Sequence, residues 1–342
     1  MIRRIKHAST ATCTLPIYMG FLMTEPNSIS CTQLAETYNI SHDSVNRFLE
    51  REDYTPHDLY QESIQHIDNN KLIVSIDDTV LDKPYSQHMD LVSYFWSGKH
   101  HRSVKGINLI TLYATDQNGQ NIPINFRIYD KSEGKTKNDY FMDMLSEVLS
   151  WGAKIQFITG DSWYSSTGNL KTIRKYGIRF MFGIDCNRKV SPEKGQWFQL
   201  RLLPDFHQGQ VVWLKDFGFV QLFKTQLKEQ QRFYIVHQDE DDLLSFEGFH
   251  ELHSSHWKIE QYHRVIKQVC HIEKFQVRRS KLILNHIFSA LMAYVEIQKN
   301  QFERIFENVY RWQKKLFRPV IKNFIDDFIL DKNHLLPQRI YK

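Results

Sequence analysis

The chain has 342 residues, of which 42% are hydrophobic and 13% aromatic, enough to bury one large core and one or two small satellite domains. Its apolar runs are too short or too interrupted to span a bilayer, and its N-terminus lacks the apolar segment of a secretory signal. The four cysteines are scattered without a CxxC pair, so their spacing indicates neither a zinc ribbon nor a disulfide framework. We therefore expect no membrane segment and a cytoplasmic location.

The net charge of +5 is unevenly distributed along the chain. Residues 261–342 contain 16 Lys or Arg against 7 Asp or Glu, so the C-terminal third is basic and the rest is slightly acidic. Such an asymmetry fits a polyanion-binding surface next to an acidic metal pocket. A solvated basic helix would give the same count, so charge alone does not decide between the two.

Residues 1–68 lack strand-like alternation and predict a helical DNA-binding domain with a helix-turn-helix. We expect Thr32 to cap its first helix and Ser41 to cap its second. The second helix would expose Asn46 and Arg47, which could contact phosphates or base edges in a major groove. Two short helices joined by a turn also occur in proteins that bind no DNA, so this function is a hypothesis.

From Lys71 onward, strands alternate with helices. The predicted elements are strands at 72–76, 106–115 and 122–129, a helix at 138–151, a strand at 154–159, a helix at 168–176 and a strand at 178–183. Three strands, helix, strand, helix, strand is the order of a ribonuclease-H-like core. The predicted fold class is therefore α/β, with a mixed five-stranded sheet flanked by helices.

The remaining segments interrupt and extend this core. Residues 189–247 contain short alternating stretches that predict a β-rich insertion, which divides the catalytic core into residues 69–188 and 248–300. Helical patterns follow at 257–269 and 282–298. Residues 301–342 are expected to form a helical basic tail.

Three acidic residues form the candidate catalytic site. Asp78 follows a buried strand and Asp161 follows another, and the carboxyl ends of parallel strands share one crevice. Glu260 lies on a predicted helix, where His263, Arg264 and Lys267 share its face at i+3, i+4 and i+7. Carboxylate oxygens are the natural ligands of Mg²⁺, and metal-assisted phosphodiester cleavage needs such a cluster.

Each part of this pattern has an ordinary structural explanation. Asp is common after strands, and an acid beside basic residues on a helix is often a surface ion-pair stripe. Asp77 competes with Asp78, because adjacent strand residues face opposite sides of a sheet. A zinc site of His253, His256 and Glu260 is also compatible with helical spacing, although no HExxH order supports it.

The motifs together resemble a known family. The segments Ile76–Thr79, Gly160–Tyr164 and Trp257–Glu260 with Lys267 are similar to the three signatures of bacterial insertion-sequence DDE transposases. In that family an Asp directly before Thr ends the first strand, a second Asp follows the fourth, and a Glu precedes a Lys by seven residues. The resemblance covers about residues 70–280 and includes the β-rich insertion and an N-terminal helical DNA-binding region.

This resemblance implies a function and a set of residue roles. Asp78, chosen because it directly precedes Thr, would hold Mg²⁺ with Asp161 and Glu260, in a two-ion site in which Mn²⁺ could substitute. Metal-activated water would cleave at the transposon ends, and the freed 3′ hydroxyl would then attack target DNA. Lys267 and Arg264 would hold phosphates. The implied partner is double-stranded DNA, bound by a homodimer or larger assembly, although the sequence shows no dimerisation motif.

The sequence departs from the family pattern before the Glu. His253 and His256 stand where the family commonly has a Tyr and an Arg, and we expect them to face DNA, with His256 donating to a phosphate at low pH. Trp163 flanks the second acid and could stack on an unpaired base, or it could simply pack in the core. Two alternatives remain: a ribonuclease-H-like nuclease that cuts without rejoining, and an inactive transposase copy that binds DNA.

Overall fold

The computed structural model describes residues 11–25, 29–98, 100–193, 195–227, 230–238 and 242–335. The first ten residues of the predicted N-terminal domain and the last seven of the predicted tail lie outside these described residues. Within the described ranges, no helix is both long and apolar enough to cross a membrane.

The N-terminal region is helical, as predicted. Its helices are α1 (Leu15–Thr24), α2 (Cys31–Tyr38), α3 (His42–Arg51) and α4 (Pro56–Ile64). Between α2 and α3, Asn39 adopts a left-handed conformation at φ 52°, which makes the turn of the helix-turn-helix. The predicted cap at Thr32 is wrong, because the Ser30 side chain accepts the Gln33 amide and starts α2 earlier.

The sheet core has the predicted strand order. Its strands are β1 (Leu72–Asp82), β3 (Arg102–Thr115), β4 (Asn121–Ile128), β5 (Ile155–Gly160) and β6 (Arg179–Ile184). β3 lies antiparallel between β1 and β4, while β5 is parallel to both β1 and β6. The resulting order β4-β3-β1-β5-β6 confirms the mixed, ribonuclease-H-like α/β class.

Two features of the first strands differ from the prediction. β1 does not end at Ile76 but continues to Asp82, because β3 still pairs with it up to Gly106 after β5 has ended. The two aspartates interrupt the apolar run without interrupting this ladder. β2 (Ser93–Ser97) was not predicted; it is a short edge strand that pairs with the beginning of β3.

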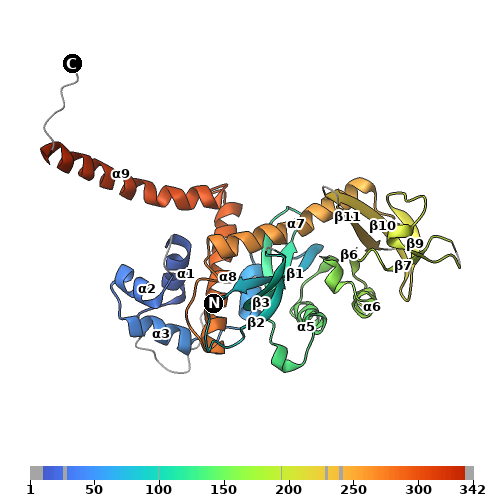
Figure 1. Cartoon of the computed structure of the whole chain (residues 1–342), viewed down its shortest axis with the longest axis horizontal. Coiled ribbons are helices and arrows are strands. Elements are labelled where there is room, and N and C mark those ends of the chain that lie inside the picture. The colour runs from blue at the N-terminus through green and yellow to red at the C-terminus, as the bar shows by residue number, and fades with distance from the viewer. Residues whose placement is uncertain are drawn as a thin grey trace, which may run out of the picture.

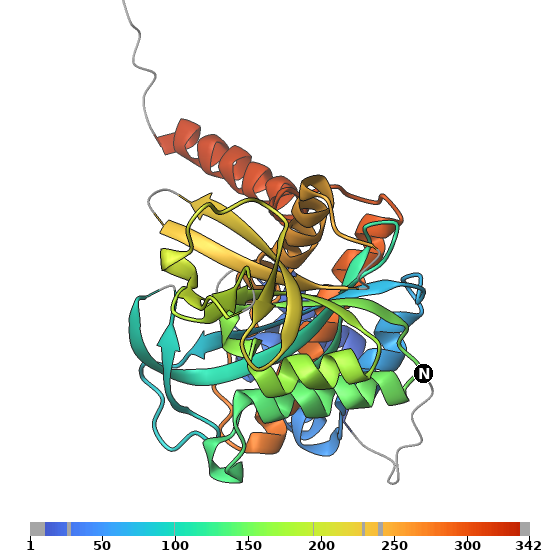
Figure 2. The same ribbon diagram turned by 90° about the vertical axis from the view of Figure 1, so that its right-hand side faces the viewer.

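Helices cover both faces of the sheet (Figure 2). α5 (Lys137–Ser150) and α6 (Thr167–Lys175) lie side by side on one face. α7 (Phe246–Gln268) packs against β1 from the other face and contacts α8 (Ser280–Phe302). α7 begins at Phe246 rather than Trp257, since Ser245 caps it by accepting the Gly248 amide.

The β-rich insertion extends the same sheet. Its strands are β7 (Lys189–Ser191), β8 (Phe198–Gln199), β9 (Gln210–Leu214), β10 (Gly218–Leu227) and β11 (Gln230–His237). β11 pairs antiparallel with β6, with Ile235 opposite Phe182, so the ladder passes from the core into the insertion without a gap. Short 3₁₀ turns lie at Lys131–Glu133, Ser162–Tyr164 and Leu200–Leu202. At the other end of the chain, α9 (Val309–Leu335) projects away from the body (Figure 1).

Asn285 of α8 joins the N-terminal helices to the core. Its side chain is fully buried, its amide donates to the carbonyls of Leu49 and Glu52 at 2.7 Å each, and its oxygen accepts the Tyr54 amide. One side chain thus bonds to the backbone of the last turn of α3 and of the segment that follows it. A buried amide with three such bonds is costly to replace.

We expect Asn285→Leu to lower the free energy of unfolding by about 2 to 4 kcal/mol, because three backbone groups lose their partner in a buried place. Chemical denaturation measures this change. Asn300→Ala is the control, since the Asn300 side-chain amide bonds, among the residues that the structure describes, only to Glu296 of its own helix. Equal effects of the two substitutions would contradict the role assigned to Asn285.

Candidate metal centre

Asp77 and Asp78 lie where β1 outlasts its parallel neighbour. The β1–β5 ladder ends at the Ile76–Gly160 pair, after which β1 pairs only with β3. The chain leaves β5 at this level and passes directly into Asp161. Strand pleating sends adjacent side chains to opposite faces, so Asp77 faces the α7 side of the sheet and Asp78 faces the α5 side.

Gly160 is required at this junction. A Cβ atom there would lie 2.6 Å from both Ile76 and Phe182, closer than real side chains approach. Any larger residue would push β5 away from its two neighbours just before Asp161. The glycine therefore fixes the position of the second acid relative to the first.

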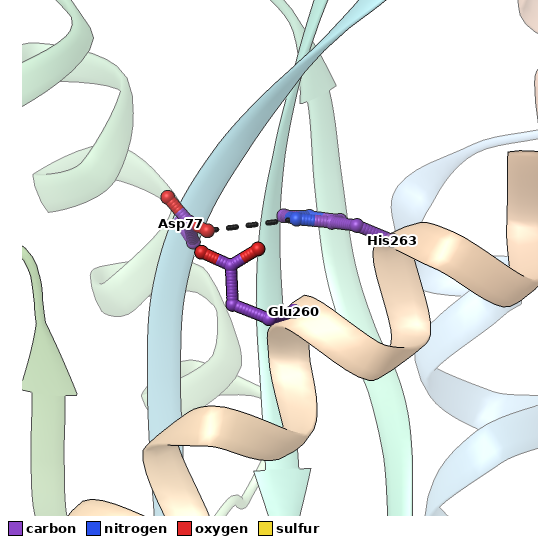
Figure 3. A group of neighbouring side chains, drawn as sticks. All are labelled: Asp77, Glu260 and His263. Atoms are coloured by element: carbon purple, nitrogen blue, oxygen red, sulfur yellow. Dashed lines mark ion pairs between the residues drawn. The ribbon is translucent and has the colours of Figure 1, made fainter. Parts of the chain in front are cut away.

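α7 carries the remaining members of the site. Glu260 and His263 are three residues apart on one face of the helix and point toward β1, where they meet Asp77 (Figure 3). One ligand atom from each of these three residues lies within 4.8 Å of the others. The Asp77 Oδ2 atom is 3.5 Å from His263 Nδ1. Among the described residues, these three have the spacing of a metal site, whereas the alternative set of His253, His256 and Glu260 does not.

Negative charge is concentrated in this place. Burial raises the pKa of Asp77 well above its usual value, and the charges of Asp161, Asp78 and Glu260 raise it further. The pKa of Glu260 is also raised, first by loss of water and then by Asp161. A bound cation would relieve this repulsion, because it stabilises the ionised form of every acid around it.

His263 is a neutral imidazole in this arrangement. Burial is the main cause that lowers its pKa to about 3, with the nearby Lys267 charge adding to the effect. Its Nε2 atom is buried and has no hydrogen-bond partner among the described residues. Two carboxylates beside a neutral imidazole are a donor set that fits a divalent ion, and the nitrogen suits Mn²⁺ better than Mg²⁺.

Asp161 follows β5 at the open side of the cluster. Its side chain is 66% exposed, and its Oδ1 lies 3.8 Å from Nε2 of His256 on α7. The His256 imidazole holds the pKa of Asp161 below its usual value, although the partial loss of water around the carboxylate opposes this effect. The other ring nitrogen of His256 lies 3.2 Å from the Thr159 hydroxyl. His256 thus bridges the end of β5 to α7.

Asp78 lies on the other face, surrounded by donors. Its Oδ2 atom accepts from Lys137 at 2.7 Å and from Asn108 at 2.6 Å, and its Oδ1 accepts from the Tyr164 hydroxyl at 2.9 Å. These three groups come from α5, β3 and the turn after β5. The carboxylate of Asp78 therefore ties together the elements behind the site rather than facing Glu260.

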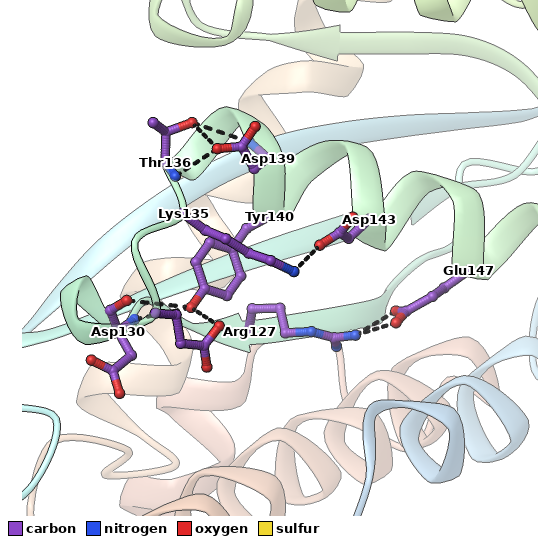
Figure 4. A network of polar contacts seen from close by, with 9 residues as sticks. Arg127, Asp130, Lys135, Thr136, Asp139, Tyr140, Asp143 and Glu147 are labelled. Carbon is purple, nitrogen blue, oxygen red and sulfur yellow. Dashed lines mark hydrogen bonds and ion pairs between the residues drawn. The ribbon is translucent and has the colours of Figure 1, made fainter.

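A polar network lies before and within α5, the helix that begins with Lys137 (Figure 4). Thr136 and Asp139 form a capping box at the start of the helix. Further along it, Asp143 pairs with Lys135 and Glu147 pairs with Arg127 of β4. The Arg127–Glu147 pair joins α5 to β4, and the capping box fixes the start of the helix, where Lys137 pairs with Asp78.

Two of the other predicted site residues form hydrogen bonds within the protein. The Lys267 ammonium donates to the Val80 carbonyl of β1 at 2.7 Å. His253 bonds to the Tyr234 hydroxyl at 3.0 Å and packs edge-on against its ring, on the insertion side of α7. The predicted phosphate contact of Lys267 and DNA contact of His253 stay predictions.

Four other predicted DNA contacts lie at the surface. Arg264 is exposed on α7, and Trp163 is 66% exposed, with the Lys137 ammonium 5.7 Å from its ring centre. On α3, the Asn46 amide lies 3.2 Å from the His42 ring, and the Arg47 guanidinium donates to the Asp43 carbonyl. Both α3 residues lie on the face away from the buried Val45 and Phe48.

Sequence reasoning missed Lys137, Asn108 and Tyr164 as neighbours of the acids. No spacing links them, because they come from three elements that meet only in the folded chain. His263 carried a signal, since it shares the helical face of Glu260 at i+3. Asp77 carried one too, through the strand alternation that made it a competitor of Asp78.

Comparison with known proteins assigns the chain to a family. The model described as "Transposase DDE domain" matches residues 68–295, about two thirds of the chain. No curated protein matches the chain. Two structures of Marinitoga piezophila Argonaute, one with 5′ OH guide RNA and one with guide RNA and target DNA, share 12% and 10% identity with TM-scores of 0.23 and 0.22.

These two matches cover 55% and 61% of this chain but only 26% and 30% of the Argonaute chains. With TM-scores this low, they add nothing to the fold assignment, which rests on the strand order.

The two adjacent aspartates should affect stability in opposite directions when measured with chelator present. Asp77→Asn should raise the melting temperature at neutral pH, because it removes a buried charge whose native pKa is raised. This gain should vanish below about pH 4, where Asp77 is protonated in both the folded and the unfolded chain. Asp78→Asn should instead lower the unfolding free energy by about 1 to 3 kcal/mol, because Lys137 loses its partner. Melting curves across pH measure both, and destabilisation by Asp77→Asn would contradict the charge argument.

Proposed function

Because this chain belongs to the DDE transposase family, we propose that it is a metal-dependent DNA transposase that cleaves insertion-sequence ends and joins them to target DNA. The observation that carries the proposal is the meeting of Asp77, Glu260 and His263 beside Asp161. Burial, and after it repulsion from neighbouring acids, raises the pKa of Asp77 and of Glu260, as expected for ligands arranged for a cation. A protein that only bound DNA would gain nothing from such repulsion.

We assign the first metal ligand to Asp77 rather than to Asp78. Motif spacing alone favoured Asp78, which directly precedes Thr79. The geometry supports Asp77, because its side chain lies on the face of the sheet that α7 and Glu260 cover. The carboxylate of Asp78 is instead paired with Lys137. In this proposal Asp78 is a positioning residue that holds α5 and the turn after β5 against β1.

The proposed ligands are Asp77, Asp161 and Glu260. His263 either donates a nitrogen to the metal or lines the site as an uncharged side chain. Divalent ions held there, Mg²⁺ with Mn²⁺ as a substitute, would supply Lewis acidity that activates water and stabilises the departing oxygen. Asp161 lies on the exposed side, where DNA would enter, and His256 keeps it ionised. Asp77 lies on the opposite, buried side of the site.

Several surface groups support DNA as the substrate. Arg264 and the exposed Trp163 lie next to the acids, as groups that could hold a phosphate and stack on an unpaired base. Asn46 and Arg47 occupy the second helix of the helix-turn-helix, the position that reads the major groove in that motif. The proposed substrate is double-stranded DNA, held by two copies of the chain that bring two ends together.

The test is cleavage of a plasmid that carries the DNA flanking the gene, with Mg²⁺ or with chelator. We expect cuts at the boundaries that require metal and fall by at least about 100-fold in Asp77→Asn, Asp161→Asn and Glu260→Gln. Glu251→Gln, on an exposed position of the same α7, is the matched control and should cut normally. Asp78→Asn should bind Mn²⁺ as tightly as the wild type even if it cuts more slowly.

The products separate the rival functions. Joined strands mark a transposase, whereas cuts without joining mark a nuclease of the same fold. Binding to the flanks without any cut would identify a DNA-binding protein that has lost catalysis. Loss of Mn²⁺ binding in Asp78→Asn but not in Asp77→Asn would show that the ligand assignment is wrong.

A further inference from the structure

Ser75 of β1 and Thr159 of β5 form a buried pair of hydroxyl groups beneath α7. They are partners in the parallel ladder, so their side chains leave the sheet on the same face, the one that α7 covers. Their exposed fractions are 1% and 0%, and their hydroxyl oxygens lie 2.8 Å apart. Thr159 comes two residues before Asp161, so the pair lies directly behind the second acid of the site.

His256 continues this pair toward Asp161. Its Nδ1 atom lies 3.2 Å from the Thr159 hydroxyl, and its Nε2 atom lies 3.8 Å from Asp161 Oδ1. The imidazole side chain is only 12% exposed. Both ring nitrogens therefore face groups of the protein, which leaves neither of them for a phosphate of bound DNA.

The position of His256 on α7 holds its ring in the site. His256 precedes Glu260 by four residues and His263 by seven, so the three side chains follow one face of the helix. That face is turned to the sheet, because Glu260 and His263 meet Asp77 there (Figure 3). His256 thus shares the support of a long helix, whereas Asp161 lies after the end of its strand.

The chain of polar contacts from Ser75 to Asp161 has a direction. An ionised carboxylate accepts hydrogen bonds and cannot donate them, so the neutral ring that suits Asp161 carries its proton on Nε2. Its Nδ1 atom is then an acceptor, and the Thr159 hydroxyl must donate to it. The oxygen of Thr159 is in turn available to accept from the Ser75 hydroxyl. Both hydroxyl protons then point along the chain toward Asp161.

Asp161 is the acid of the site that most needs a fixed partner. Its side chain is 66% exposed, and among the residues that the structure describes only His256 lies within ion-pair distance of it. An exposed side chain loses rotamer freedom when it is held in one place, which costs free energy. The 3.8 Å contact is longer than a hydrogen bond, and the exposed carboxylate has room to turn and shorten it.

We propose that His256 is a positioning residue for the metal ligand Asp161. Thr159, with Ser75 behind it, selects the ring form that carries its proton on Nε2. One oxygen of Asp161 accepts from His256, and the other remains for the cation, as is usual where an outer partner orients a ligand. This inference rests on the proposed function, since it takes Asp161 as a metal ligand. It replaces the DNA contact that the sequence suggested for His256 with a contact inside the protein.

The first test determines which ring nitrogen of His256 carries the proton in the metal-free full chain. Nitrogen-15 NMR of histidine-labelled protein distinguishes the two neutral forms, and the spectrum of His256→Gln identifies the signals of this residue. At about pH 8, above the ordinary pKa of histidine, we expect a proton on Nε2 and none on Nδ1. Thr159→Val keeps the side-chain shape without the hydroxyl and should give a mixture of both forms. A proton on Nδ1 in the wild type would overturn the proposal.

The second test measures Mn²⁺ binding to the full chain, without DNA, by electron paramagnetic resonance. We expect the dissociation constant to rise by about 10-fold or more in Thr159→Val and in His256→Phe, the range found when a ligand loses its outer partner. Thr159→Ser keeps the hydroxyl and should restore most of the affinity. A purely structural role of Thr159 would instead make the two substitutions differ in melting temperature but not in Mn²⁺ binding.

Ser289→Ala is the matched control for removal of a buried hydroxyl. The Ser289 hydroxyl donates to the Asn285 carbonyl within α8, so its loss should leave Mn²⁺ binding unchanged. Melting curves identify the variants that remain folded. If Thr159→Val does not fold, Ser75→Ala gives the same comparison, because it removes the donor behind Thr159 and should raise the Mn²⁺ dissociation constant by a smaller factor.

The remaining outcomes separate this proposal from the proposed function. Unchanged Mn²⁺ binding in folded Thr159→Val and His256→Phe would overturn the positioning role, and so would tighter binding, which would mean that the ring repels the cation. Weaker binding of flanking DNA by His256→Phe in chelator, with Mn²⁺ binding unchanged, would return His256 to a DNA contact. In each case the proposed function still stands if Asp161→Asn loses metal binding and cleavage. Conversely, Mn²⁺ binding that depends on Thr159 in a chain that cuts no DNA would support the positioning role and refute the proposed activity.

Discussion

Electrostatic repulsion between acids is the constraint around which the site is built. Four carboxylates lie near one another, those of Asp77, Asp78, Asp161 and Glu260. Their surroundings differ. Asp78 is paired with Lys137, and Asp161 is stabilised by His256. Asp77 and Glu260 are left with raised pKa values. The two pairings reduce the total charge, and the remaining imbalance is what a divalent cation would neutralise.

Backbone geometry makes this arrangement possible. β5 ends at Gly160 while β1 runs on beside β3 to Asp82, so the parallel ladder opens just where the acids lie. The missing Cβ of Gly160 lets the two strands approach closely up to that point. α7 then packs across β1, and its Tyr262 hydroxyl meets Thr111 of β3. The contacts of α7 with β1 and β3 thereby hold Glu260 and His263 over Asp77.

The order of the core strands could be predicted from sequence because each has a local apolar signature, such as residues 106–115 of β3. The length of β1 could not, since its outer half begins with Asp77 and Asp78 and pairs with β3 after the ladder to β5 has ended. Motif spacing located the three regions that carry the acids. It could not decide between two adjacent aspartates, because that choice depends on which face α7 covers.

The neighbours of Asp78 illustrate a second limit. Lys137, Asn108 and Tyr164 are brought together by three separate elements, and a single sequence holds no record of such contacts. Lys267 shows the opposite case. Its spacing from Glu260 was visible, but its ammonium bonds to the backbone of β1, a partner that no motif could indicate.

The pairing of β11 with β6 also bears on the order in which the protein is made. Asp77 and Asp161 leave the ribosome early, whereas Glu260 follows about 100 residues after Asp161. α7 comes shortly after β11, which must first find β6 across the whole insertion. A nascent chain therefore carries two acids for a considerable time without the third. The insertion acts as a delay that keeps the metal centre incomplete until synthesis has passed Glu260.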